Sequence, residues 1–216
     1  MLTREQFLPH EMRIVAGLRT QGVSDEQVIV RVKSENLFQY PTERMVANRA
    51  TVCLRRLDAM VPTDAACAAR GIDPKTAVEA ALSLTGLMAS GTPTQADQAI
   101  FYSMICRYDI VREFVLVEVG ERLQNFDYAF TAADLNAFMT RFTTEYPDAA
   151  RWTEATVKRI KGSIRQTLRH AGLIGEGMGP ESERLSPLFL DSDVERALVQ
   201  LGEQPLFAAL TGREVM

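Results

Sequence analysis

The sequence predicts an all-α globular protein that carries, in addition, one short β-hairpin. Its 216 residues are 46% hydrophobic and 24% charged, a balance typical of a soluble globular chain. Apolar residues recur at helical spacings of three and four along much of the chain, whereas alternating β-branched runs are scarce. A chain of this length holds one large domain or two to three small ones. We expect three segments, at 1–62, 63–130 and 131–216.

Residues 1–62 are expected to form three helices with the spacing of a helix-turn-helix unit. Ser24 and Gln27 make a capping-box pattern at the start of the second helix, and Pro62 stops the third. The third helix would take the DNA-reading position, and it carries four arginines against two acids. Because three-helix units are common, an ordinary helical unit without DNA contact is the alternative. The helices are expected at about 9–20, 24–33 and 42–60, with outward arginines Arg44, Arg49, Arg55 and Arg56.

The middle segment, 63–130, is predicted to form a helical core. Its aromatic residues, such as Phe101 and Phe114, stand at helical spacing, and the run FVLVEV is mostly apolar. Such a pattern is typical of packing surfaces, and it contains no cofactor-binding motif. Helices are expected here at about 74–88, 94–107 and 109–123.

The C-terminal segment has the element order of a winged helix-turn-helix. An amphipathic helix at 132–146 ends at Pro147, and Thr153 is a suitable N-cap for the next helix. Gly172 is suited to end that second helix, and a Gly-rich stretch at 175–180 fits the tip of a short hairpin. In this motif the second helix enters the major groove of DNA.

The second of these helices, at about 154–171, is predicted to have one apolar face and one basic face. Between 151 and 170, six Lys or Arg residues stand against Glu154, a local charge of +5, whereas the whole protein carries −4. An acidic protein that gathers positive charge on one helix is expected to present it to a partner, and nucleic acid is the first candidate. A solvated charged face is the alternative. The apolar stripe is Val157, Ile160, Ile164, Leu168 and Ala171, and the basic stripe is Lys158, Lys161, Arg165 and Arg169, with Arg159 beside it.

Several classes of function have no support in the sequence. With two histidines and no nucleotide-binding or nucleophile motif, neither an enzyme nor a metal or cofactor site is expected. The longest uncharged run, 80–96, is too short and polar to cross a bilayer, so no membrane contact is expected. Three scattered cysteines indicate reduced thiols in a cytoplasmic protein. The acidic segment 181–216, with a helix expected at 191–202, is either a partner surface or a solvated closing segment.

Four stretches of the chain carry a family resemblance. They are SENLFQYPTERMVANRATVCLRRL, QAIFYSMICRYDIVREFVLVEVGERL, TEATVKRIKGSIRQTLRHAGLI and LSPLFLDSDVERAL, in that order. The more specific motifs are the Glu35-Asn36-Leu37 turn, the Tyr108 and Phe114 pair, and Thr156–Lys161 leading into Ala171-Gly172-Leu173. On these residues the chain resembles the BREX protein A (BrxA) family of bacteriophage exclusion systems, over about residues 10–200.

The resemblance implies an all-α protein with two helix-turn-helix-like units that binds double-stranded DNA. It would work beside a methyltransferase and other BREX components in phage defence, and the family supplies no catalytic residues. Family members are often described as inner-membrane proteins, a description with which the hydropathy of this chain disagrees. We expect a monomer. The residues implied for DNA contact are Arg44, Arg49, Arg55, Arg56, Thr153, Thr156, Lys158, Arg159, Lys161, Arg165 and Arg169.

Two functional hypotheses remain open at this stage. The first is a non-enzymatic, weakly sequence-selective DNA-binding protein whose basic helix 154–171 lies on the backbone and in the major groove. The second is a helical adaptor whose basic helix docks an acidic protein partner within a defence complex. The acidic C-terminal segment and the modest net charge favour the second. Both roles can occur in one protein.

Overall fold

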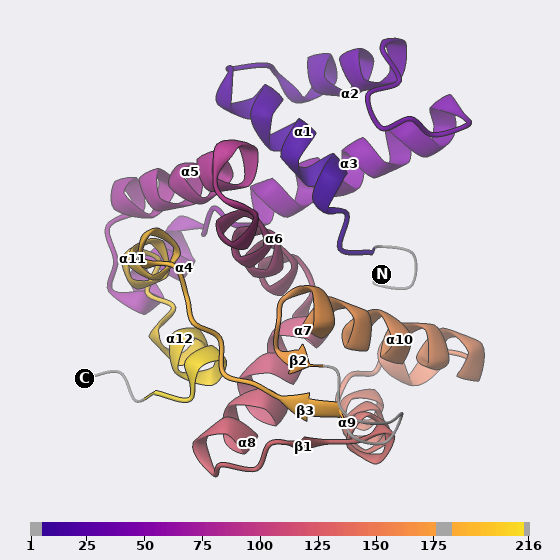
Figure 1. Cartoon of the computed structure of the whole chain (residues 1–216), viewed down its shortest axis with the longest axis vertical. Helices are drawn as coiled ribbons and strands as arrows, with labels where there is room; N and C mark the ends of the chain where they lie inside the picture. The colour runs from indigo at the N-terminus through magenta and orange to yellow at the C-terminus, as the bar shows by residue number, and fades with distance from the viewer. Residues whose placement is uncertain (1–5, 176–182, 214–216) are drawn as a thin grey trace. The chain divides into compact units, whose positions relative to one another are not determined.

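The computed structural model describes residues 6–175 and 183–213, and this part of the chain is mostly helical with one small β-sheet (Figure 1). It forms two compact units. The N-terminal unit contains Leu8–Arg107 and Leu190–Glu203, and the C-terminal unit contains Met1–Phe7, Tyr108–Phe189 and Gln204–Met216. These bounds differ from the three predicted segments, because residues 190–203 return to pack with helices of the N-terminal unit. No helix of the described ranges has both the length and the apolar content needed to span a membrane.

Three helices open the N-terminal unit, and their starts are those that the sequence predicts. The Ser24 hydroxyl accepts a hydrogen bond from the N–H of Gln27, whose side chain accepts one from the N–H of Ser24. This is the predicted capping box. Thr42 caps the third helix by accepting from the N–H of Met45. An apolar stripe at helical spacing along this helix is buried: Val46, Ala50, Cys53, Leu57 and Met60. The helices are α1 (Pro9–Thr20), α2 (Asp25–Ser34) and α3 (Glu43–Ala59).

Four further helices complete the N-terminal unit. Helix α5 packs against α1, α6 and α11, which places the closing segment of the unit on its central helices. A buried ion pair fixes this return: Arg70 Nη1 lies 2.9 Å from an oxygen of Glu203, whose side chain is 2% exposed. The Tyr102 hydroxyl donates to the same carboxylate. The helices are α4 (Asp64–Arg70), which the sequence did not predict, α5 (Pro74–Ser90), α6 (Pro93–Arg107) and α11 (Ser192–Gln200).

The C-terminal unit begins with one continuous helical stretch whose middle is π-helical. The sequence predicts a single helix at 109–123, and the structure divides it into α7 (Asp109–Glu113), η2 (Phe114–Val119) and α8 (Gly120–Gln124). Helix α12 packs against η2 and α8. Helix α12 comes close to α8 at Gly120, where an added Cβ would lie 3.0 Å from the Cβ of Ala209 on α12. The remaining helices of the unit are α9 (Ala132–Glu145), the 3₁₀ turn η3 (Ala149–Arg151), α10 (Glu154–His170) and α12 (Gln204–Thr211).

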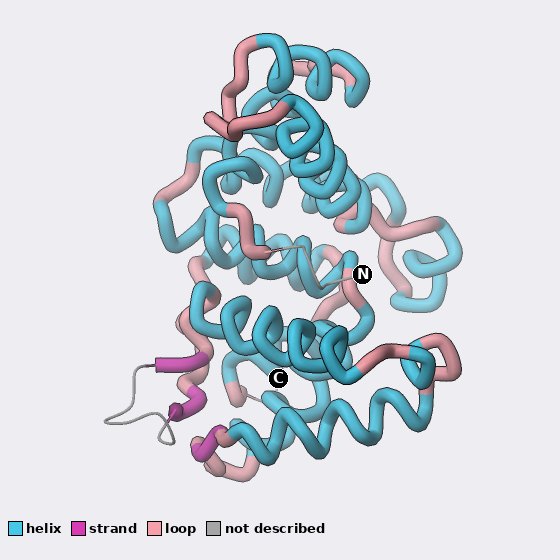
Figure 2. Tube along the Cα trace, turned by 90° about the vertical axis from the view of Figure 1, so that its right-hand side faces the viewer, coloured by secondary structure: helices cyan, strands magenta, loops and turns pink. Residues whose placement is uncertain are grey.

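A three-stranded antiparallel sheet is formed by the segment before α9 and the two segments after α10. The sheet order is β1-β3-β2, so β3 lies in the middle (Figure 1). The predicted hairpin is present as the pairing of β2 with β3. Of its predicted tip at 175–180, Gly175 lies in β2, and 176–180 lie outside the described residues. The sequence did not predict β1, which pairs Phe130 with Glu183. In Figure 2 the strands gather at one end of the neighbouring helices α9 and α10. The strands are β1 (Ala129–Phe130), β2 (Ile174–Gly175) and β3 (Glu183–Leu185).

Candidate nucleic-acid interface

Helix α10 is fixed at both ends by the residues that the sequence predicts. Thr153 is its N-cap, because the hydroxyl accepts a hydrogen bond from the N–H of Thr156 at 3.2 Å. The two threonine hydroxyls also lie 3.1 Å apart. Gly172 follows the helix with φ of +80°, a conformation that glycine adopts without strain. The predicted apolar face packs inward, with Ile160, Ile164 and Leu168 buried.

An aromatic cluster holds the connection between α9 and α10. Phe142 stacks on Tyr146, with ring centroids 4.3 Å apart, and on Trp152, at 6.0 Å. The Tyr146 hydroxyl donates to Glu113 at 2.6 Å, and this hydrogen bond to a carboxylate raises the pKa of the tyrosine above its ordinary value. Three aromatic side chains therefore set where α10 starts relative to α9.

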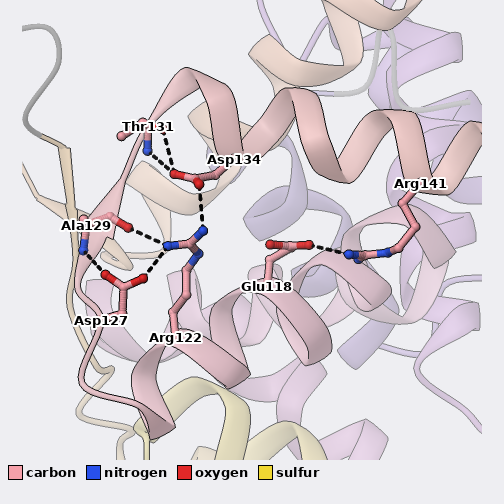
Figure 3. Close-up of polar contacts among 7 residues, drawn as sticks. All are labelled: Glu118, Arg122, Asp127, Ala129, Thr131, Asp134 and Arg141. Atoms are coloured by element: carbon pink, nitrogen blue, oxygen red, sulfur yellow. Dashed lines mark hydrogen bonds and ion pairs between the residues drawn. The ribbon is translucent and has the colours of Figure 1, made fainter.

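Arg122 on α8 organises the start of α9 and the strand before it (Figure 3). Its guanidinium contacts Asp127 at 2.7 Å, the carbonyl of Ala129 at 3.1 Å and Asp134 at 2.7 Å. The second oxygen of Asp134 accepts hydrogen bonds from both the N–H and the hydroxyl of Thr131. Both carboxylate oxygens of Asp134 are thus bound within the unit. One arginine fixes β1 and the first turn of α9 together.

The basic residues of α10 fall into two groups according to their partners. Lys158 and Arg159 are exposed, and Lys161 is half-buried, with its ammonium donating to Asn136 Oδ1 on α9 at 2.6 Å. None of these three cations pairs with a carboxylate within the described residues. Arg165 and Arg169, in contrast, both bind Glu183 on β3.

Glu183 is more deeply buried than the two arginines that it binds. Its side chain is 7% exposed, whereas those of Arg165 and Arg169 are 31% and 57% exposed. The Arg165 Nε atom lies 2.8 Å from Glu183 Oε2, and Arg169 donates to Oε1. Each guanidinium has five N–H donors, so the contact with Glu183 leaves others free to point outward. The carboxylate therefore orients both arginines and cancels part of their charge.

A small pocket opens between α9 and α10 on the basic side of the helix. It has a volume of about 240 Å³. Three cations of α10 contribute to its wall, and the first turn of α9 forms the other side. A second pocket, of about 300 Å³, lies on the other side of Asn136 and Lys161, which line both. The lining of the first pocket, here called the α9–α10 pocket, is Ala132, Leu135, Asn136, Lys158, Lys161, Gly162 and Arg165.

The arginines predicted on α3 are not equivalent. Arg44 and Arg55 are exposed, and Arg49 is half-buried. Arg56 is 0% exposed, so it lies in the core and its prediction as a DNA-contacting residue is wrong. The reason is that α3 packs against α1, α2 and α6, so that more of its circumference is covered than the single apolar stripe indicates. The outward set on α3 is reduced to Arg44, Arg49 and Arg55.

Sequence reasoning missed the residues that arrange the basic helix. These residues contact partners that are 12 to 25 positions away along the chain: Arg122 contacts Asp134, Asn136 contacts Lys161, and Glu183 contacts Arg169. No local pattern signals such pairs. The Asp134 that follows Thr131 by three positions is the one detectable signal, since it resembles a capping box.

The chain is mostly helical and carries a small sheet and one basic helix. A crystal structure of an uncharacterized protein from Magnetospirillum magneticum has the same fold, with a TM-score of 0.74 and 17% identity over 98% of this chain and 97% of that one. The chain is also similar to the BREX protein BrxA of Escherichia coli O9:H4 (strain HS), at 20% identity over 127 residues. That alignment covers 59% of this chain and 58% of the relative.

The chain belongs to the BrxA family, whose profile matches residues 1–202. The match includes α1 to α11 and therefore both units. It agrees with the family that the sequence motifs indicated.

Proposed function

We propose that this protein is a non-enzymatic, double-stranded DNA-binding component of a BREX-like phage-defence system. Its C-terminal unit would act as a winged helix-turn-helix, with α10 as the recognition helix on the DNA backbone and in the major groove. Membership of the BrxA family and the name of the E. coli relative, BREX protein BrxA, support the defence role.

The observation that carries the DNA-binding proposal is the position of the basic stripe on α10. The stripe lies between α9, at Asn136, and the middle strand β3, at Glu183. The elements follow the order helix, β1, α9, α10, β2, β3, and β3 is central in the sheet. In a winged helix-turn-helix this order places the exposed face of the second helix against the major groove. The basic stripe of α10 would then face the DNA.

The proposal is tested by fluorescence anisotropy with a random duplex of about 30 base pairs at several salt concentrations. Three α10 cations lack a carboxylate partner within the described residues: Lys158, Arg159 and Lys161. Neutralising three phosphates gives a slope of log affinity against log salt of about −3, and engaging Arg165 and Arg169 as well would bring it to about −4 to −5. A flat salt response would exclude phosphate contact by α10.

A charge-reversal pair locates the contact. The double variant Lys158→Glu and Arg159→Glu is expected to abolish duplex binding without changing the helical circular dichroism signal. The matched control is Lys75→Glu with Arg196→Glu, which makes the same change in net charge at exposed positions of the N-terminal unit. Equal losses in both variants would mean that net charge, and not α10, determines binding.

The N-terminal unit supplies a second proposed contact through α3. Arg44 and Arg55 are exposed on α3, which is the third helix of a three-helix unit and packs against α2. Replacing both with Ala is expected to weaken duplex binding less than the α10 pair does, because the local charge of 42–60 is +2 against +5 for 151–170.

A second candidate function is supported by the contact between α10 and Glu183. Two arginines of the helix already bind one carboxylate, and carboxylates of an acidic protein partner within a defence complex would be bound by the same chemistry. Affinity purification of the tagged protein with nuclease treatment separates the two functions. A partner that survives nuclease and is lost in the Lys158→Glu, Arg159→Glu variant supports the adaptor. Loss of all partners with nuclease counts against it.

A further inference from the structure

We propose that the α9–α10 pocket receives one backbone phosphate of the DNA duplex. This inference rests on the proposed DNA binding and deepens it, because it assigns one phosphate to one place on the protein. The other cations of α10 would then contact neighbouring phosphates or base edges.

Charge is the first support for a phosphate in the pocket. Lys158, Lys161 and Arg165 all line it, and Glu183, which contacts Arg165, is not among the lining residues. The hydrogen bond from Lys161 to Asn136 holds one ammonium at the edge of the pocket. Three cations, of which Glu183 partly neutralises Arg165, create a positive site around one small hollow, and a phosphate diester is the anion that DNA offers.

The first turn of α9 is the second support. Ala132 and Leu135 line the pocket. A helix start has four N–H groups without a partner in the backbone of the helix, and the capping box of α9 binds two of them, those of Thr131 and Asp134. The N-terminal end of the helix also carries a partial positive charge. Asp134 stands in the same turn, but both of its oxygens are bound, one by Arg122 and the other by Thr131 (Figure 3). Arg122, which also binds Asp127, therefore offsets part of the negative charge of this acid.

Gly162 is the third support, because it leaves the pocket open. It lies in the interior of α10, where glycine costs up to about 1 kcal/mol relative to alanine. A Cβ added there would meet nothing within 4 Å, so packing within the unit does not require glycine. Any side chain at this position would stand at the wall of the pocket. A phosphate that enters between Lys158, Lys161 and Arg165 accounts for the missing side chain.

The test fills the pocket without changing charge. In Gly162→Gln, a neutral side chain of a helix-forming residue is placed in the wall, so the thermal midpoint is expected to stay equal or rise. Duplex affinity is expected to fall, and the salt slope is expected to become shallower by about 1, the contribution of one phosphate. Ser163→Gln is the control, because it adds the same side chain to the same helix at a residue that does not line the pocket.

The outcomes separate this inference from the proposed function. If the wild type binds with a steep salt slope and Gly162→Gln retains both affinity and slope, the pocket assignment is wrong while the DNA-binding proposal stands. If the wild type binds no duplex at low salt, both fail.

Titration with inorganic phosphate, followed by amide chemical shifts, provides the second measurement. We expect shifts at Gly162 and at the first turn of α9 that are lost in Gly162→Gln and that duplex DNA competes away. Phosphate shifts that DNA does not displace would overturn the DNA assignment and identify a site for free phosphate.

Discussion

Glu183 Oε2 lies 2.8 Å from Arg165 Nε, and this contact ties the middle strand of the sheet to the basic helix. The carboxylate is buried, whereas the guanidinium reaches the surface. Because Arg169 binds the other carboxylate oxygen, one acid orients two of the cations that the DNA-binding proposal places beside phosphates. The free positive charge of α10 is accordingly smaller than its sequence indicates.

Replacing Glu183 with Gln is expected to release this charge. The neutral amide keeps the size of the side chain but no longer cancels the charge of the arginines, so duplex binding at low salt should tighten and the salt slope should steepen from about −3 toward −4 or −5. Thermal stability should fall, because a buried ion pair loses one charged partner. Anisotropy and thermal unfolding measure the two effects. Weaker DNA binding would mean instead that the orientation of the arginines outweighs their charge.

Arg55 and Arg56 are adjacent on α3 but are expected to behave differently on substitution. Arg56 is fully buried, so Arg56→Ala removes packed volume and leaves the groups around it without their partner; we expect a loss of about 2 kcal/mol or more in the free energy of unfolding. Arg55 is exposed, and Arg55→Ala should change stability by about 0.5 kcal/mol or less. Urea denaturation of both variants checks this. Equal stabilities would contradict the burial of Arg56.

Gly120 is expected to be required by the close packing of α12. A Cβ at this position would lie 3.0 Å from the Cβ and 3.3 Å from the Cα of Ala209, so Gly120→Ala should destabilise the protein by about 1–3 kcal/mol. Gly86 on α5 has open space, and Gly86→Ala should be neutral or stabilising by up to about 1 kcal/mol. Thermal unfolding distinguishes the pair. Adding Ala209→Gly to Gly120→Ala should restore part of the loss, and the absence of any rescue would show that this contact is not the cause.

Cys53 is expected to make the protein sensitive to alkaline pH. Burial of the thiol disfavours the thiolate and raises the pKa of Cys53 from 9.0 to about 12. The folded state therefore holds this proton more tightly than the unfolded state. The resulting stability is fully present below pH 9 and is lost as the pH rises from 9 to 12, at up to about 1.4 kcal/mol per pH unit.

The measurement is the free energy of unfolding between pH 7 and pH 11 for the wild type and Cys53→Ala. The variant should start less stable at pH 7 because of the volume it loses, and its stability should decline less steeply above pH 9. Tyr40, whose pKa is raised to about 12 by partial burial and by its hydrogen bond to Glu11, is present in both proteins, and the Cys53 thiolate adds to that rise only in the wild type. Parallel pH profiles would refute the assignment to Cys53.

Local sequence signals were sufficient for the helices that contain strong caps and apolar periodicity. The capping box at Ser24, the N-cap Thr153 and the stop at Gly172 stand where the sequence places them. The short elements were missed for a physical reason. A strand of two residues, such as β1, has no periodicity of its own and exists because β3 supplies its hydrogen-bond partner.

The candidate site divides in the same way between local and long-range information. The sequence by itself determined that α10 is amphipathic and that its cations form a stripe, since both follow from spacing along one helix. Only the tertiary structure decided which cations carry free charge. Glu183 reaches Arg165 and Arg169 from β3, Asn136 reaches Lys161 from α9, and the packing of α3 removes Arg56 from the surface. Such partners are brought together by the burial of apolar faces on several elements at once, and no single segment encodes that arrangement.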